Sequence, residues 1–206
     1  MIGAALAGAT RLMCGTSVVW HCDPRSPRQR IYFGNHASHL DFVLIWSAFP
    51  AARRPPLRPV AGRDYWERGP LRRYLASQVF HAILIERAGA AAHGDRGSAA
   101  AEIQRIAGEM GRDSSLILFP EGTRGAGGEP GPFKSGLFHL SRMRPDVELV
   151  PVYLENLNRI LPKGEVLPVP MLSRMVFGAP LRITNHDEKH EFLASARAAL
   201  IDLRTM

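Results

Sequence analysis

The feature that most constrains the fold is a regular alternation of short apolar segments with longer segments of helical character. Strands are predicted at 17–21, 31–35, 58–62, 79–86, 115–119, 148–154 and 175–178. Helices are predicted at 38–49, 63–77 with an interruption at Gly69-Pro70, 95–110, 133–143 and 187–203. Strands that alternate with helices at this spacing predict an α/β fold, with a largely parallel or mixed sheet flanked by helices.

The length of the chain favours a single domain over 1–206. At 206 residues and 22.7 kDa it can bury a core without a disulfide or a structural metal. Its two cysteines, Cys14 and Cys22, lack the paired spacing and the histidine partners that a zinc site needs. We therefore expect free thiols in a reducing compartment, no bound metal, and no internal repeat or linker.

The first fifteen residues predict a short helix with one apolar face. Ile2, Leu6, Ala9 and Met13 recur at steps of four, three and four. This face is expected either to lie in a membrane interface or to pack on the core, and the sequence does not choose between them. Arg11 splits the longest apolar run and no basic segment precedes it, so the segment fits neither a secretory signal nor a membrane span.

One candidate site is the segment Asn35-His36-Ala37-Ser38-His39-Leu40-Asp41, which joins an apolar strand to an apolar helix. In α/β sheets ligands bind at such strand ends. If Ser38 caps the helix, Asp41 falls in its first turn and can reach back to hold one imidazole nitrogen of His36, as in a general base. The alternative is a capping box in which Asp41 satisfies only the helix terminus. His39 is the rival histidine and is interpreted as a surface or packing residue.

A second candidate site is Phe119-Pro120-Glu121-Gly122-Thr123-Arg124, directly after a strongly apolar strand. Pro120 ends the strand pairing, Gly122 allows close approach of a ligand to the backbone, and Arg124 offers a planar fork for phosphate oxygens. These features are typical of an oxyanion-binding turn, although a solvated turn with a surface arginine can have the same sequence. A glycine-rich stretch follows, at 125–131.

The positive net charge of the chain indicates which classes of partner it can bind. The formal net charge is +7 and the pI is about 10.1, which favours anionic partners such as lipid headgroups, phosphorylated substrates, coenzyme A or acidic carrier proteins. No recognition helix, RNA-binding strand pattern or zinc finger supports a nucleic-acid partner. No Gly-x-Ser-x-Gly nucleophile elbow supports a hydrolase.

The two motifs in this order, about eighty residues apart, resemble the glycerolipid acyltransferase family, in particular bacterial 1-acyl-sn-glycerol-3-phosphate (lysophosphatidic acid) acyltransferases. Asn35, His36 and Asp41 match that family's Asn-His-x4-Asp signature, and 119–124 matches its Phe-Pro-Glu-Gly-Thr-Arg signature residue for residue. Ile83-Leu84-Ile85-Glu86-Arg87 resembles an intervening arginine-ended motif, with Glu86 where the family often has Asp. Further counterparts are Phe133-Lys134-Ser135-Gly136 and Val150-Pro151, so the resemblance covers 31–153 with its motifs.

The resemblance implies a glycerol-3-phosphate acyltransferase-like fold and an O-acyltransferase. His36, oriented by Asp41, would deprotonate the acceptor hydroxyl, which attacks the thioester of acyl-CoA or acyl-carrier protein, with no tightly bound cofactor. The residues implied in binding the acceptor phosphate are Arg87, Glu121, Gly122, Thr123, Arg124 and Lys134. A phosphate-bearing lysolipid as acceptor and a peripheral position on the cytoplasmic face of the membrane follow from the same resemblance.

Alternative interpretations stay open for several of these residues. A non-catalytic membrane-binding protein of the same fold, or an acyltransferase for another lysolipid, would share the motifs. Arg87 could be a surface charge at a strand end. Lys134 at a helix start would face an unfavourable dipole, which favours a nearby anion. Trp46 and Phe49 belong either to the core or to an acyl groove.

Overall fold

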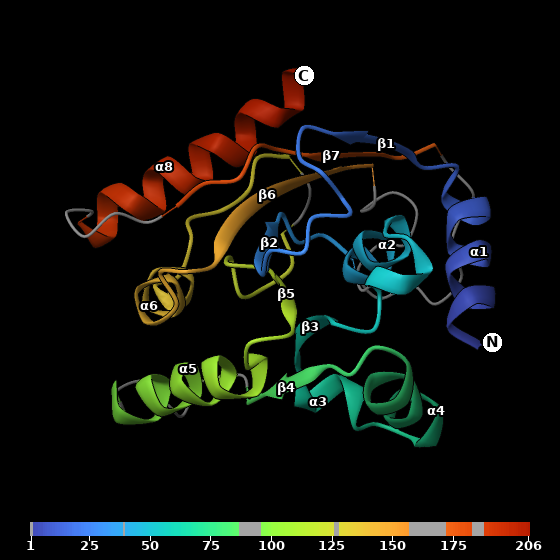
Figure 1. Cartoon of the computed structure of the whole chain (residues 1–206), viewed down its shortest axis with the longest axis horizontal. Coiled ribbons are helices and arrows are strands. Elements are labelled where there is room, and N and C mark those ends of the chain that lie inside the picture. Colours follow the sequence, from blue (N-terminus) through green and yellow to red (C-terminus); the bar gives the residue numbers. More distant parts are fainter. Residues whose placement is uncertain (1, 39, 87–95, 126–127, 157–171, 183–187) are drawn as a thin grey trace.

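A seven-stranded sheet with helices on both faces forms the molecule (Figure 1). The computed structural model describes residues 2–38, 40–86, 96–125, 128–156, 172–182 and 188–206, except for the side chains of 96–98. The strands are β1 (Ser17–Trp20), β2 (Arg30–Gly34), β3 (Leu57–Gly62), β4 (Ile83–Ile85), β5 (Ser115–Leu118), β6 (Glu148–Glu155) and β7 (Arg174–Phe177).

The strand order is β1-β7-β6-β2-β5-β3-β4. Strands β6 and β7 pair antiparallel, and the other neighbouring pairs are parallel. The predicted α/β class with a largely parallel or mixed sheet is therefore confirmed. Strands β2 and β5 lie next to each other in the middle of the sheet, so their carboxyl ends bring the two candidate segments to one edge.

Two helical layers cover the sheet. One face carries α1 (Ile2–Cys14) and α2 (Asp41–Ala48), and the other carries α5 (Arg96–Met110), α6 (Gly136–Met143) and α8 (Lys189–Asp202). Between β3 and β4 the chain forms α3 (Arg63–Trp66), α4 (Pro70–Tyr74) and the π-turn η2 (Leu75–Val79), while the short turns η1 (Ala51–Arg53) and η3 (Leu203–Thr205) lie elsewhere. Alternate strand residues serve the two cores: Tyr32 faces the α1/α2 layer, whereas Ile31 and Phe33 face the α5/α6/α8 layer.

The predicted strand at 79–86 is wrong in its first half. Residues 75–79 instead form the π-turn η2, in which the Phe80 N–H donates to the Leu75 carbonyl, 2.9 Å away. The chain then turns at His81, which has a φ of +49°, and β4 begins at Ile83. Phe80 is buried under α2 rather than in the sheet, and a short apolar run does not reveal which of these a chain adopts.

Two predicted helices begin later than the sequence indicates. The helix after His36 begins at Asp41 instead of 38, and its N-cap is Leu40 without a side-chain cap, so Ser38 does not cap it. The helix after the glycine-rich loop begins at Gly136 instead of 133. Lys134 therefore lies in the preceding loop and not at a helix start.

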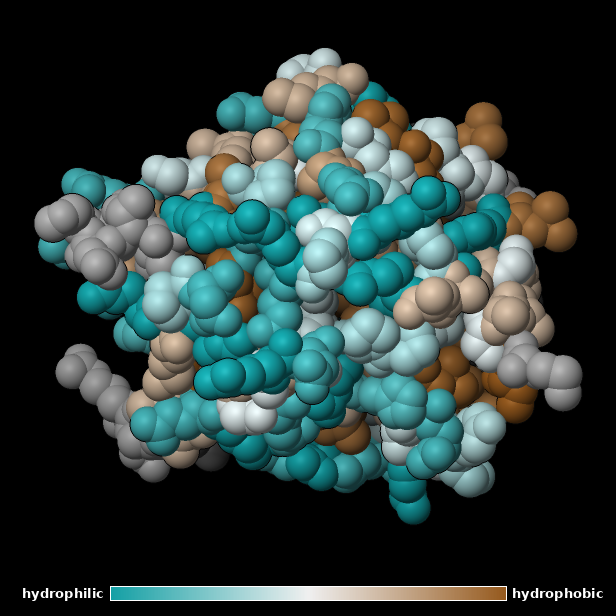
Figure 2. All heavy atoms as spheres, viewed as in Figure 1, coloured by the Kyte–Doolittle hydropathy of each residue, from teal (hydrophilic) through white to brown (hydrophobic). Residues whose placement is uncertain are grey.

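The N-terminal helix α1 is present as predicted, and three residues of its predicted apolar face, Ile2, Ala9 and Met13, are exposed. It packs on the core through Ala7, Thr10 and Cys14, while Ile2 and Leu12 point outward, with Leu12 88% exposed. Hydrophobic side chains are visible on the side of the molecule where α1 lies (Figure 2). No helix in the described ranges has both the length and the apolar character needed to cross a bilayer. The prediction of one domain over 1–206 stays a prediction.

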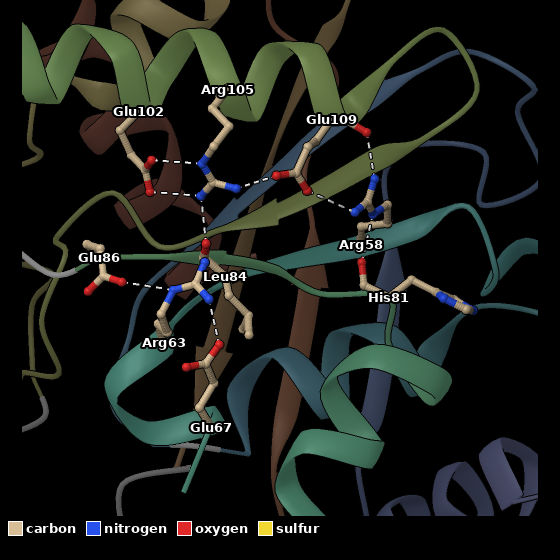
Figure 3. Close-up of polar contacts among 9 residues, drawn as sticks. All are labelled: Arg58, Arg63, Glu67, His81, Leu84, Glu86, Glu102, Arg105 and Glu109. Carbon is tan, nitrogen blue, oxygen red and sulfur yellow. Dashed lines mark hydrogen bonds and ion pairs between the residues drawn. The ribbon is translucent and has the colours of Figure 1, made fainter.

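The edge strand β4 is short and its backbone is covered by arginines (Figure 3). Arg105 of α5 donates to the Leu84 carbonyl at 2.6 Å, and Arg58 of β3 donates to the His81 carbonyl at 2.7 Å. Side chains that occupy edge carbonyls block pairing with another strand. They also fix β4, whose carboxyl end reaches the same sheet edge as β2 and β5.

Candidate active site

His36 and Asp41 are in direct contact just beyond the carboxyl end of β2. The His36 Nδ1 lies 2.8 Å from the Asp41 Oδ2, and the two side chains are 13% and 1% exposed. The same Oδ2 also accepts the Ala37 and Ser38 backbone N–H groups, at 2.6 and 2.8 Å. A carboxylate oxygen only accepts, so Nδ1 carries the proton that it donates to Asp41. The Nε2 of His36 has no protein hydrogen-bond partner in the described residues and has a lone pair to offer.

Asp41 contacts both the imidazole and the turn before α2, although Ser38 is not the N-cap of that helix. Its Oδ2 accepts the Ala37 and Ser38 N–H groups, which closes the turn, and the same oxygen contacts the Nδ1 of His36. Its second oxygen, Oδ1, is buried and finds no partner within the described part of the chain. A buried acceptor without a partner costs stability, and this cost falls on the residue that orients His36.

Phe119 and Asn35 fix the surroundings of the imidazole. The Phe119 ring stacks on His36 with centroids 4.4 Å apart and planes 17° from parallel. The Asn35 amide donates to the Leu154 carbonyl and accepts the Leu154 N–H, both at 2.8 Å, which extends the β2–β6 pairing past the strand end. The imidazole can therefore neither tilt nor shift with the backbone at low cost.

Glu121 joins the two candidate segments. Its Oε1 accepts the His36 backbone N–H at 2.9 Å, and its Oε2 accepts the Gly131 N–H at 2.8 Å. A third bond runs from the Gly125 N–H to the His36 carbonyl at 2.8 Å. The turn after β5 thus holds the His36 backbone on both its N–H and its carbonyl side. The sequence places Glu121 in the phosphate pocket, but it does not reveal that both carboxylate oxygens are engaged by backbone.

Gly122 and Lys134 lie against each other beside this turn. Gly122 has a φ of +68°, and a Cβ there would come within 2.8 Å of the Lys134 side chain. The Lys134 N–H donates to the Pro120 carbonyl at 2.8 Å, which fixes the lysine backbone on the turn. Only glycine combines this left-handed conformation with the space that Lys134 fills. The approach of a ligand to the Gly122 backbone stays a prediction.

Arg124 belongs to the turn whose Gly125 N–H bonds the His36 carbonyl, and Lys134 packs against Gly122 of the same turn. Arg124 is half-buried and Lys134 is exposed, and neither forms an ion pair within the described ranges. Thr123 is exposed next to Arg124. Arginine and lysine without carboxylate partners favour an anionic ligand.

A further cation lies at the carboxyl end of β3, and the sequence analysis did not single it out. Arg63 donates from Nε to the Glu86 carboxylate at 2.8 Å and pairs with Glu67 through its other guanidinium edge (Figure 3). Its position directly after an apolar strand is the signal that could have found it. Arg87 and His39 lie outside the described residues, so their predicted roles are untested.

The larger aromatic residues of α2 belong to the core. Phe49 is 2% exposed and Trp46 is 3% exposed, both within the cluster between the sheet and α1/α2. Among the described residues, no group of three His, Cys, Asp or Glu side chains is close enough to hold a metal ion.

Comparison with known proteins gives a consistent result. A family model described as Acyltransferase matches residues 21–155. Two curated relatives, the 1-acyl-sn-glycerol-3-phosphate acyltransferases of Limnanthes alba and Limnanthes douglasii, are each 28% identical over 177 residues, which cover 83% of this chain. The chain spans 57% of the length of these relatives.

A solved structure shares the fold. It is the 1-acyl-sn-glycerophosphate (LPA) acyltransferase PlsC of Thermotoga maritima, with a TM-score of 0.70 and 17% sequence identity. The match covers 99% of this chain and 78% of that one. The seven-stranded sheet and its helical layers are thus an architecture already seen in a solved structure.

Proposed function

Because this chain belongs to the acyltransferase family, we propose that it transfers a fatty acyl group from an acyl thioester to the hydroxyl of a lysophosphatidic acid-like acceptor in phospholipid synthesis. The observation that carries the proposal is that Glu121 connects the two candidate segments. Its carboxylate accepts the His36 backbone N–H, while the His36 Nδ1 contacts Asp41. The proposed proton acceptor, His36, and the turn that carries Arg124 are therefore connected by hydrogen bonds at one edge of the sheet.

His36 acts as the general base. Its Nδ1–H is engaged by Asp41, so Nε2 is left to take the proton of the acceptor hydroxyl as the oxygen attacks the thioester carbonyl. The carbon–oxygen bond forms, the carbon–sulfur bond breaks, and the imidazolium returns its proton to the departing thiolate. Asp41 stabilises the positive imidazolium in between and keeps its ring oriented. Acyl-CoA or acyl-carrier protein supplies the thioester, and no acyl-enzyme is required.

The acceptor phosphate binds next to His36. Arg124 and Lys134 provide its positive partners, with Thr123 and the bare backbone at Gly122 completing the pocket. Glu121 has a different role from the one expected of a phosphate ligand. Both of its oxygens accept backbone N–H groups, and its negative charge would repel phosphate, so it positions His36. Arg87 stays in the proposal as a further phosphate ligand.

The membrane surface is the proposed location of the acceptor, and we assign the protein a peripheral place on the cytoplasmic face. The outward side of α1 supports this, since Ile2, Ala5 and Leu12 are exposed there. Its one charged residue, Arg11, turns back to donate to the Ser47 carbonyl at the end of α2. The exposed apolar face of α1 can enter the interface of a bilayer, and the net charge of +7 attracts the protein to anionic headgroups.

The activity is tested with purified protein, both donor types and a small panel of acceptors. The panel contains glycerol 3-phosphate, lysophosphatidic acid, and a lysophospholipid whose phosphate is esterified. We expect ester formation with lysophosphatidic acid to exceed that with the esterified headgroup, because Arg124 and Lys134 match a terminal phosphate. Absence of acyl transfer from either donor to every acceptor would refute the proposed activity.

Membrane binding is tested separately by sedimentation with vesicles that contain anionic lipid. We expect the bound fraction to fall as salt rises, because screening weakens the attraction between basic side chains and headgroups. Leu12→Asp should reduce the fraction that remains bound at high salt, and Met206→Asp, at the other terminus, serves as the matched exposed control. Equal binding by wild type and Leu12→Asp would rule out α1 as the contact.

A further inference from the structure

A concave site lies next to the end of α2 that is far from Asp41. It is a cavity of about 490 Å³ between the first turn of α1, the last turn of α2 and the α4–η2 segment. Figure 1 shows these helices together at one end of the molecule. The apolar part of its wall includes Ile2, Trp46 and Val79, and the polar part includes Arg54, Tyr74 and Gln78. The volume lies within the range of small-molecule sites, which is about 300–1,000 Å³.

Packed aromatic rings separate this cavity from His36. Phe80 contacts the rings of Phe42, Trp46 and Trp66, with centroids 4.9, 5.3 and 6.0 Å apart. Phe80 is 1% exposed and Phe42 is 6% exposed, so this cluster is filled core. A ligand in the cavity is therefore not in contact with the imidazole.

The charge at the polar end of the cavity is unbalanced. The Arg54 guanidinium lies 5.2 Å from the centroid of the Trp46 ring and donates to the Phe49 and Ser47 carbonyls, at 2.9 and 3.3 Å. Arg11 donates to the same two carbonyls, so two cations share one helix end. Neither has a carboxylate partner within the described ranges, and burial together with the Arg11 charge lowers the pKa of Arg54. A negative ligand group would relieve this repulsion.

We propose that this cavity binds a single-chain fatty carboxylate, with the hydrocarbon chain along Ile2, Trp46 and Val79 and the carboxylate on Arg54. The Nη1 of Arg54 has no protein partner among the described residues and is free to donate to the carboxylate. Arg11 does not line the cavity, so a monoanionic head matches the one guanidinium that does, whereas a phosphate dianion would leave charge unpaired. The ring of Trp46 gives the chain an apolar wall and reports its presence. The site is separate from the acyl-transfer site of the proposed function.

Bromine-labelled fatty acid tests the proposal, because bromine quenches tryptophan fluorescence only at short range. The chain has three tryptophans, so Trp20→Phe with Trp66→Phe leaves Trp46 as the sole reporter. We expect saturable quenching by the brominated acid below its micelle concentration. The matching alcohol should bind at least about tenfold more weakly, because it lacks the charge-assisted bonds to Arg54. An alkyl phosphate of the same length should also bind more weakly than the acid.

Matched variants separate this site from the others. Arg54→Gln should weaken binding by about tenfold, while Arg53→Gln should leave it unchanged, because Arg53 points to the Ser26 carbonyl and away from the cavity. His36→Ala should bind the acid as the wild type does. Calorimetric titration in the native tryptophan background gives a second readout if the double Phe variant does not fold. Equal binding by Arg54→Gln and wild type, loss of binding in His36→Ala, or no saturable binding would each overturn the proposal.

Discussion

Buried carboxylates lie near both ends of β2, and their hydrogen-bond partners differ in kind between the two ends. At the amino end, Arg30 donates to Glu148 at 3.0 Å, with the two residues 4% and 7% exposed, and Arg28 and Arg182 also approach that carboxylate. At the carboxyl end, Asp41 and Glu121 are held by backbone N–H groups and by one imidazole.

The two ends therefore differ in whether their charged groups are paired with each other. Arginines surround Glu148, and although burial raises its pKa, hydrogen bonds and charge from Arg30 and Arg182 lower the pKa to below the ordinary glutamate value. At the carboxyl end no arginine among the described residues pairs with Asp41 or Glu121, and Arg124 and Lys134 have no carboxylate partner in that part of the chain. Paired charges contribute to the stability of the fold, whereas cations without a carboxylate partner are available to bind an anionic substrate.

The largest effect is expected for His36→Ala. Loss of the base should lower kcat by roughly 100- to 10,000-fold, because general base catalysis contributes about that much. The unfolding midpoint should change little, since the side chain is held by one carboxylate and one ring. Acyl transfer and thermal unfolding are measured side by side with His190→Ala, an exposed histidine of α8, as the control. Turnover near that of the control would remove His36 from the mechanism.

A smaller loss is expected for Glu121→Gln. The amide keeps one acceptor oxygen, but its NH2 group would face a backbone N–H of His36 or Gly131, so the catalytic segment shifts. We expect kcat to fall about tenfold to a hundredfold with little change in the acceptor KM. Glu129→Gln, exposed on the same loop, is the matched control. A rise in KM at constant kcat would instead make Glu121 part of the phosphate pocket.

Arg124→Ala should act mainly on acceptor binding. Removal of one charge-assisted partner is expected to raise KM for a phosphate-bearing acceptor by about tenfold. Steady-state kinetics with lysophosphatidic acid measure this, and Arg112→Ala at the opposite sheet edge is the control. An unchanged KM would mean that the phosphate binds elsewhere.

Glu148→Gln should have the smallest effect on activity but should lower stability. We expect a loss of about 2 to 4 kcal/mol at neutral pH, because Arg30 would be left buried without its counter-charge. The pKa of Glu148 is lowered in the folded state, so its contribution is present above the unfolded value of about 4.3 and is lost as pH falls through the folded value. Urea unfolding of both proteins from pH 7 to pH 3 should show the difference shrink, and a constant difference would contradict this.

The sequence predicts the candidate site at the carboxyl ends of β2 and β5 better than it predicts the boundaries of the elements around it. Each of the two candidate segments, 35–41 and 119–124, follows a short apolar strand. These two strands are parallel neighbours, so their carboxyl ends lie together, and the proximity of the segments follows from the local pattern and from sheet geometry. The strand at 79–86 was predicted wrongly in its first half because Phe80 is buried by a helix that the local sequence does not specify.

Contacts between distant segments are what the sequence could not supply. The bond from Glu121 to the His36 N–H joins positions 85 residues apart, and the pairing of Glu148 with Arg30 joins positions 118 apart. Both depend on strand order and register, which a single sequence does not encode in its local periodicity. The sequence also left open whether the apolar face of α1 packs on the core or lies in a membrane interface, because the contacts of Ala7 and Cys14 form only in the folded chain.

The central claim, that His36 and Asp41 act as one unit, is tested most directly by a double-mutant cycle. The acyl-transfer rate is measured for His36→Ala, Asp41→Asn and the double variant, with circular dichroism to confirm that each is folded. If Asp41 works through His36, the double variant is no slower than His36→Ala. Losses that multiply would show that the two residues act independently, and would contradict the proposed catalytic pair.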